Sequence, residues 1–266
     1  MSMNPSPAHF RFHAWRRAIG NFSLIRHRHC DGQLVSMHQS GTHWLKFMLA
    51  NALSYQYELP PPRFNHANDY IGGPKDPPCH APLPHLLSSH SIAHPWLGQR
   101  WLRLPRYVVL VRDVRVALVA NYAKWATRYG VDFEEYLQGD PHGRRYNSDV
   151  WWCFRFLNSW GPLLTQSASA TTLVRYEDLQ SDPYRELSRV NVAWELGLKP
   201  EALEHGIAAS DKSAMAAKDD PARPPGAVRT STQAPLDHFD GAAREWFSDL
   251  CAQHLRYPLG YDYTRW

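Results

Sequence analysis

The chain has 266 residues, of which 44% are apolar and 20% charged, and a formal net charge of +4 at pH 7. This length predicts one large domain or two small ones with a substantial core, and the composition is typical of a soluble globular protein. No apolar run approaches the roughly 18 residues of a membrane-spanning helix, and the first residues lack the apolar stretch and cleavage site of a signal peptide. We therefore expect a cytoplasmic protein.

The cysteines and the basic residues argue against a zinc site, a disulfide framework and a nucleic-acid interface. The cysteines lie far apart without Cys-x-x-Cys spacing, which predicts reduced thiols rather than a zinc site or a disulfide framework; they are Cys30, Cys79, Cys153 and Cys251. Several arginines crowd the N-terminal segment, namely Arg11, Arg16, Arg17, Arg26 and Arg28. They could make peripheral contact with an anionic membrane surface or form a solvated basic face. The basic stripe is too weak to predict nucleic-acid binding.

The first predicted strand and helix follow a polar lead-in over residues 1–32. Residues 33–38 are expected to form a buried strand, and residues 42–57 a helix with apolar residues at three- and four-residue spacing. A strand that turns directly into a helix leaves the first N–H groups of that helix unpaired at its positive end. The turn is therefore a candidate site for a phosphate or sulfate group.

The residues of this turn suit an anion. Ser40 and Thr42 offer hydroxyl donors, and Gly41 allows the backbone to approach the anion closely. The alternative interpretation is an ordinary turn and helix cap.

Residues 58–85 are predicted to be a loop, because they contain eight prolines and the Gly72-Gly73 pair. Long loops in compact domains usually serve function or are disordered, and we expect a lid on the substrate side. Residues 86–90 are a candidate second strand.

The rest of the chain alternates strands with helices. We expect strands at 106–112 and 171–175, and helices at 114–127, 149–167, 183–196 and 241–255, with a loop over 212–235. The helix over 149–167 is apolar nearly all round and should be buried on several sides. This alternation predicts one α/β domain over residues 1–266, with a central, mainly parallel sheet flanked by helices.

Four segments, in this order, resemble the cytosolic-type sulfotransferases, which use the donor 3′-phosphoadenosine-5′-phosphosulfate (PAPS). Gln39-Ser40-Gly41-Thr42-His43-Trp44-Leu45 is similar to their 5′-phosphosulfate loop, usually Lys-Ser-Gly-Thr-Thr-Trp-Leu. Ser88-Ser89-His90 stands where the family has Lys-Thr-His. The strand ending in Arg112-Asp113 looks like the 3′-phosphate element, and Arg175-Tyr176-Glu177-Asp178-Leu179 matches the Tyr-Glu-Asp-Leu element. The resemblance implies a P-loop-NTPase-like sulfotransferase fold.

The resemblance also implies roles for particular residues. It makes His90 the general base, with the loop around the 5′-phosphosulfate formed by Gln39, Ser40, Gly41, Thr42 and His43. It places Trp44 on the adenine and Tyr176 on the nucleotide, while Glu177 and Asp178 brace their turn. It assigns the 3′-phosphate to Arg112, to the position of Ala120 and, in a late loop, to Arg229 with Arg223 as the alternative. From the residues alone, Trp44 could equally be core, Arg112 could pair with a carboxylate, and Arg229 could be a solvated loop residue.

The chain departs from the family pattern at several of these positions. Gln39 replaces the loop lysine, Ser88 replaces the lysine before the base, and Ala120 replaces a serine that binds the 3′-phosphate. A cationic His43 could partly replace the missing lysine, with His38 and Lys46 as other candidates, although Lys46 lies further along the helix. Asn121 could supply the donor missing at Ala120.

Two functions from different classes remain open. The first is a sulfotransferase that moves a sulfuryl group from PAPS, without a metal, to a hydroxyl or amine of a small molecule, lipid or carbohydrate. The second is a catalytically weak nucleotide- or partner-binding protein on the same fold. The absence of a GxxxxGK[ST] motif argues against a P-loop kinase or NTPase. Neither the acceptor nor the oligomeric state can be predicted.

Overall fold

A four-stranded parallel sheet forms the centre of the protein. The computed structural model describes residues 5–20, 30–73, 78, 80, 83–94, 106–166, 171–222 and 234–266. The sheet has the order β2-β1-β3-β4, with β1 (Gly32–Ser36), β2 (Leu86–Ser89), β3 (Arg106–Val111) and β4 (Thr171–Arg175). Leu34 of β1 lies opposite Ser88 of β2 and Val108 of β3. The predicted fold class, α/β with a central parallel sheet, is confirmed.

Both faces of the sheet are buried, as expected for parallel strands covered by helices. Because side chains alternate along a strand, neighbouring residues enter different cores. One core contains Leu34, Val108 and Leu110, and the other contains Val35, Tyr107, Val109 and Val111. This two-sided burial explains why β1 and β3 are almost continuously apolar in sequence.

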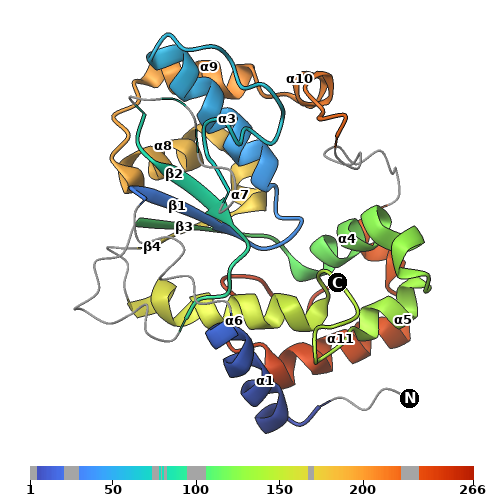
Figure 1. Cartoon of the computed structure of the whole chain (residues 1–266). Coiled ribbons are helices and arrows are strands. Elements are labelled where there is room, and N and C mark those ends of the chain that lie inside the picture. The colour runs from blue at the N-terminus through green and yellow to red at the C-terminus, as the bar shows by residue number, and fades with distance from the viewer. Residues whose placement is uncertain are drawn as a thin grey trace.

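One face of the sheet is covered by the helices drawn above it in Figure 1. They are α3 (Thr42–Gln56), α7 (Tyr176–Ser181), α8 (Pro183–Trp194), α9 (Pro200–Ala208) and α10 (Lys212–Ala217). Close packing of α9 on α3 requires Gly206, since a Cβ there would lie 2.4 Å from the carbonyl oxygen of Met48. The loop between β1 and α3, residues 37–41, holds the candidate anion site and is called the anion loop below. The helix that follows it is therefore held firmly against the domain.

The opposite face is covered by α6 (Val150–Gln166), which runs beneath the sheet in Figure 1. The other elements on this side are α1 (Pro7–Gly20), α4 (Val114–Tyr129), α5 (Phe133–Gln138), the 3-10 helix η2 (Pro235–His238) and α11 (Gly241–His254). The prediction that the tryptophan-rich helix is buried on several sides is confirmed, because Trp151, Phe154, Phe156, Leu157 and Trp160 are all buried.

The sequence analysis missed several short or polar helices. Residues 7–20 of the lead-in form α1, which Phe10 and Ala18 anchor in the core, and residues 212–217 of the predicted loop form α10. Helices α5, α7 and α9 were not predicted either. Four of these five helices have fewer than ten residues, too few turns for apolar periodicity to stand out; α1 was missed because much of its surface is polar or exposed.

The described part of the 58–85 loop is largely packed against the domain. Tyr70 and Ile71 are fully buried, and Gly72 forms an isolated parallel bridge with Leu87 at the edge of β2. Whether this loop covers a substrate stays a prediction, since residues 74–77, 79 and 81–82 lie outside the described residues.

The cysteines within the described residues are consistent with reduced thiols. Cys30, Cys153 and Cys251 are buried, and none of these three thiols is part of a disulfide. Cys79 lies outside the described residues. No helix in the described part of the chain is both long enough and apolar enough to cross a membrane.

Candidate functional site

The succession of strands in the sheet reverses between β1 and β3. From β1 the chain moves to β2 on one side and then to β3 on the other, and parallel sheets bind ligands where this succession reverses. The loop after β1, Arg112 after β3 and His90 after β2 all leave the sheet at this edge. The topology therefore brings three of the predicted segments together.

The loop after β1 has the backbone of an anion-binding turn. The Met37 N–H donates to the Leu110 carbonyl at 2.9 Å, so β1–β3 pairing continues one residue beyond the strand. Gln39 (φ 62°) and Gly41 (φ 87°) then turn the chain with left-handed conformations. Gly41 is the N-cap of α3 and has no side chain to accept hydrogen bonds from the first turn. The backbone N–H groups of that turn stay available to an anion.

The two predicted hydroxyl donors are engaged within the loop. Ser40 is fully buried, and its Oγ donates to the Met37 carbonyl at 2.6 Å. Thr42 Oγ1 donates to Ser36 Oγ at 2.8 Å. Because both hydroxyls donate within the loop, these bonds hold the shape of the turn, and the backbone N–H groups at the start of α3 are the donors suited to a ligand.

Arg112 and Tyr176 contact the anion loop and hold its backbone in place. Arg112 Nη1 donates to the Gln39 carbonyl at 3.0 Å, and its guanidinium carbon lies 4.2 Å from the centre of the Tyr176 ring. The same ring packs on Gly41, where a Cβ would lie 2.5 Å from Tyr176 Cδ2. Three segments that are far apart in the sequence thus meet at one point.

Trp44 lies at the edge of this cluster. Its Nε1 donates to the Ser210 carbonyl at 3.0 Å, and its ring meets that of Tyr176 edge to face at 6.0 Å between centroids. The residue is half-buried, so part of the indole is accessible beside Tyr176. Its proposed contact with adenine stays a prediction.

His90 is held in one orientation by β1. Its Nδ1 lies 2.8 Å from the Ser36 carbonyl oxygen and 3.2 Å from Ser36 Oγ. Because a carbonyl can only accept, the hydrogen-bond pattern assigns the proton to Nδ1 and leaves the lone pair on Nε2. Desolvation lowers the pKa of His90, opposed by the bond to Ser36. The residue nevertheless keeps exposure to solvent. A neutral imidazole with a free Nε2 can act as a base.

The structure corrects the idea that a histidine replaces the missing lysine charge. Burial, followed by repulsion from Lys46, lowers the pKa of His43 to about 3. Burial also lowers the pKa of His38 well below its usual value; its ring stacks 4.0 Å from that of His90 and lies 4.4 Å from that of Trp152. With pKa values lowered in this way, both imidazoles are neutral at pH 7.

Lys46, which the sequence analysis placed further along the helix, points into the site. The residue is only 2% exposed, and its Nζ donates to Asn68 Oδ1 at 2.7 Å and to Ser88 Oγ at 3.2 Å. The sequence showed only that Lys46 follows Thr42 by four residues, which places both on the same side of the helix. That this side faces β2 is known from the structure. Apolar periodicity does not reveal that a lysine occupies a buried position.

The other residues considered for the 3′-phosphate include two neighbours on α4. Ala120 is half-exposed, whereas Asn121 is buried with its Oδ1 accepting from the Tyr129 hydroxyl at 2.8 Å. Asn121 Nδ2 has no hydrogen-bond partner among the described residues, and its role as a donor to the 3′-phosphate stays a prediction. Arg229 and Arg223 lie outside the described residues.

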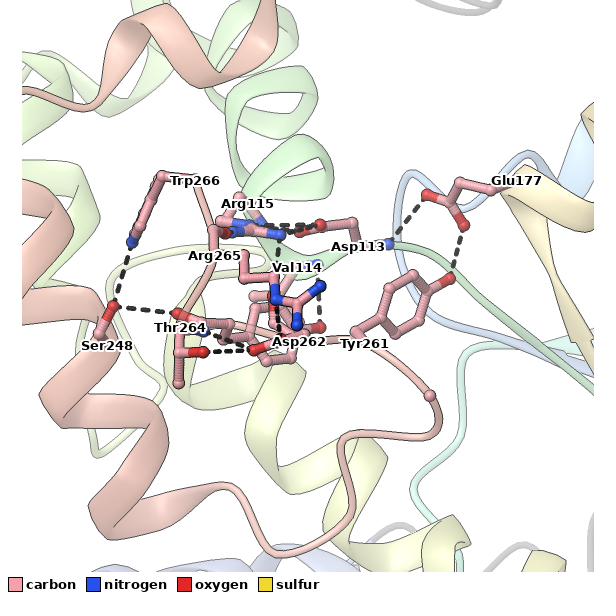
Figure 2. Close-up of polar contacts among 12 residues, drawn as sticks. Asp113, Val114, Arg115, Glu177, Ser248, Tyr261, Asp262, Thr264, Arg265 and Trp266 are labelled. Atoms are coloured by element: carbon pink, nitrogen blue, oxygen red, sulfur yellow. Dashed lines mark hydrogen bonds and ion pairs between the residues drawn. The ribbon is translucent and has the colours of Figure 1, made fainter.

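Glu177 and Asp178 brace their turn, as predicted. Glu177 Oε1 accepts from the Asp113 N–H at 3.2 Å, and its Oε2 accepts from the Tyr261 hydroxyl at 2.6 Å (Figure 2). Asp178 forms an ion pair with Arg175, with 2.7 Å between Oδ2 and Nε. Glu177 therefore ties the turn that carries Tyr176 to the turn that carries Arg112.

The C-terminal segment supports the same turn, which the sequence analysis did not foresee. Asp113 caps α4 and forms an ion pair with Arg115, 2.6 Å between Oδ2 and Nη2. Figure 2 shows Arg115 reaching the carbonyl of Arg265. The Tyr263 hydroxyl accepts from the Val114 N–H at 3.3 Å. These contacts fix the start of α4 directly after Arg112.

A cavity of about 500 Å³ lies elsewhere, between α1, α6 and α11. Its lining includes Phe10, Trp15, Arg155 and His254, and none of the predicted site residues. It does not contribute to the cluster described above.

Comparison with known proteins supports the fold. No protein-family model matches the chain, and no curated protein matches its sequence. Mouse sulfotransferase SULT7A1 complexed with PAP aligns over 92% of this chain and 90% of its own, with a TM-score of 0.54 and 15% identity. Retinol dehydratase with androsterone and the inactive cofactor PAP aligns over 91% and 88% (TM-score 0.56, 14% identity). The same protein with retinol and PAP aligns over 87% and 83% (TM-score 0.57, 14% identity).

Identities this low establish the fold rather than the activity. The fold that the four sequence segments implied is confirmed across about nine-tenths of the chain. The protein has the α/β fold of the cytosolic sulfotransferases.

Proposed function

We propose that this protein is a sulfotransferase that moves a sulfuryl group from PAPS to an acceptor hydroxyl or amine. The acceptor would belong to a small molecule, a lipid or a carbohydrate. The observation that carries the proposal is the position of His90, whose Nδ1 is bonded to the carbonyl of Ser36, the last residue before the anion loop. A base with a free Nε2 therefore stands beside a backbone suited to a phosphosulfate.

The residues present fit such a donor. Gly41 has the left-handed backbone and lacks a Cβ, and α3 begins there without a side-chain cap. Arg112 at the strand end offers a planar guanidinium, which suits a phosphate. PAPS supplies an activated sulfuryl group, and transfers of this kind depend mainly on positioning and on charge stabilisation. The chemistry needs no metal.

His90 would act on the acceptor. Its Nε2 takes the proton as the acceptor oxygen bonds to sulfur, and the bond between sulfur and the 5′-phosphate oxygen breaks. The N–H groups at the start of α3 stabilise the negative charge left on that phosphate. Ser36 positions the base and, through its hydroxyl, also contacts Thr42 of the loop.

A catalytically weak binding protein is the second candidate. One observation favours it: the imidazoles of His38 and His43 are neutral at pH 7, and Gln39 carries no charge. Residues 38–44 therefore contribute no positively charged side chain. Such a protein would bind the nucleotide without efficient transfer.

Calorimetric titration with adenosine 3′,5′-bisphosphate (PAP), compared with AMP, tests the donor site. We expect micromolar or tighter binding of PAP with a clear preference over AMP. Binding of neither nucleotide would contradict the proposal. His90→Ala should leave PAP binding intact and abolish transfer, so unchanged turnover in that variant would remove His90 as the base. Wild-type binding with no transfer to any acceptor in a broad panel of alcohols and amines would favour the second candidate.

A further inference from the structure

Lys46 connects the helix of the anion loop to the strand of the base. It lies in the second turn of α3, and its ammonium contacts Asn68 Oδ1 at 2.7 Å and Ser88 Oγ at 3.2 Å. Ser88 belongs to β2, two residues before His90. The ammonium is thus fixed near the carboxyl end of β2 although the side chain is 2% exposed.

The charge of Lys46 acts on groups from both elements. After desolvation, repulsion from Lys46 is the next cause that lowers the pKa of His43, and it also contributes to lowering the pKa of His90. Lys124 of α4 repels both of these histidines as well. Coulomb interactions of this kind are strong only at short range in a poorly solvated site. The geometry agrees with this: Lys46 contacts Ser88, two residues before His90, and lies one helical turn after Thr42 of the loop.

We propose that Lys46 supplies, from inside α3, the positive charge that the loop lacks at Gln39 and that β2 lacks at Ser88. This inference rests on the proposed function and deepens it. The ammonium attracts the anionic donor and offsets the negative charge that grows as the sulfuryl group leaves the phosphate. Asn68 and Ser88 act as positioning residues, because their oxygens hold the ammonium at the boundary between loop and base.

Binding of PAP, with adenosine as the uncharged control ligand, measures this contribution by calorimetry. Lys46→Met keeps the length of the side chain and removes its charge, and it should weaken PAP binding about 10- to 100-fold. The affinity for adenosine should not change, because adenosine has no phosphate. Lys46→Arg, which retains the charge, should bind PAP within about fivefold of the wild type.

A second variant tests the charge with the lysine still in place. Asn68→Asp puts a carboxylate beside the ammonium without changing the volume, and it should weaken PAP binding in the same direction as Lys46→Met. Gln56→Glu makes the same amide-to-carboxylate change at the far end of α3, where Gln56 contacts Gly197 and Lys199, and it is the matched control, expected to bind PAP within about threefold of the wild type. If Lys46→Met does not fold, Asn68→Asp still decides the question.

Moving the charge separates it from a merely structural role. Gln39→Lys in the Lys46→Met background should recover at least tenfold of the lost PAP affinity. The NMR titration of the His90 ring gives a readout independent of ligand: its midpoint should rise in Lys46→Met, because a repelling charge has been removed. His38, Lys124 and the Ser36 carbonyl, which also face this ring, are unchanged in the comparison.

The outcomes distinguish this inference from the proposed function. If the wild type does not bind PAP, the proposed function fails. If the wild type binds PAP, and Lys46→Met and Asn68→Asp bind it equally well, only the role of Lys46 is overturned. An affinity loss that Lys46→Arg shares and that Gln39→Lys does not restore would also overturn it, since shape rather than charge would then be responsible.

Discussion

Replacing Gly41 with alanine tests the contact between the anion loop and the Tyr176 turn. Gly41 has a φ of 87°, and an added Cβ would lie 2.5 Å from Cδ2 and 2.7 Å from Cε2 of Tyr176. Real side chains do not approach this closely, so the ring must move. Because the ring also lies under the Arg112 guanidinium, its displacement disturbs the strand end that carries Arg112.

Two terms contribute to the loss of stability. A left-handed backbone costs a residue with a Cβ about 1–2 kcal/mol, and forcing an extra methyl group into an occupied site costs about 1–3 kcal/mol. Since Tyr176 is half-buried and can shift, we expect Gly41→Ala to lower the free energy of unfolding by about 2–5 kcal/mol. PAP affinity should fall at least tenfold as the N-cap of α3 moves.

Urea unfolding of three variants separates the two terms. Gly130 also has a left-handed φ, 65°, but nothing lies within 4 Å of an added Cβ, so Gly130→Ala measures the backbone term alone. In the double variant Gly41→Ala with Tyr176→Ala, the steric term should vanish while the backbone term remains. Equal losses for Gly41→Ala and Gly130→Ala would refute the packing of Tyr176 on the loop.

Two further predictions concern charge at the site. Arg112→Ala should weaken binding of PAP at least tenfold more than binding of AMP, because AMP lacks the 3′-phosphate; equal calorimetric losses would mean that Arg112 acts only by holding the Gln39 carbonyl. His43 has a pKa of about 3 in the folded protein and an ordinary value near 6.5 when unfolded. Below pH 6.5 the unfolded chain therefore binds a proton that the folded protein does not, and His43 removes stability as the pH falls toward 3. Between pH 7 and pH 4, the free energy of unfolding should fall by about 1–3 kcal/mol less in His43→Thr than in the wild type, a range reduced because the side chain is partly exposed. Urea unfolding at the two pH values measures this difference. An identical pH dependence in both proteins would show that His43 is not buried as a neutral ring.

Several strands and helices, and the anion loop, could be predicted from local sequence patterns. The strand over 171–175 was predicted with its observed bounds, and helix α3, predicted over 42–57, was placed within one residue. The anion loop was recognisable because glycine, small hydroxyl residues and a helical pattern follow directly after an apolar run. Signals of this kind arise between neighbours in sequence, where backbone sterics and apolar periodicity act.

Short and polar elements were harder to predict. Helix α10 lies in a segment rich in lysine and alanine, and α1 exposes Phe12 and Trp15 while only Phe10 and Ala18 are buried. Their helical state depends on tertiary contacts that compensate for weak periodicity.

The sequence by itself determined that an anion loop, a histidine, an arginine and a Tyr-Glu-Asp-Leu turn follow one another in the order of a sulfotransferase. Only the tertiary structure decided that His43 is neutral and that Lys46 reaches Ser88. It also decided that the C-terminal Tyr261 holds Glu177 beneath the Arg112 turn. Protonation depends on how many atoms exclude water from a group, and these contacts join residues distant in sequence, so both emerge only when the chain is folded.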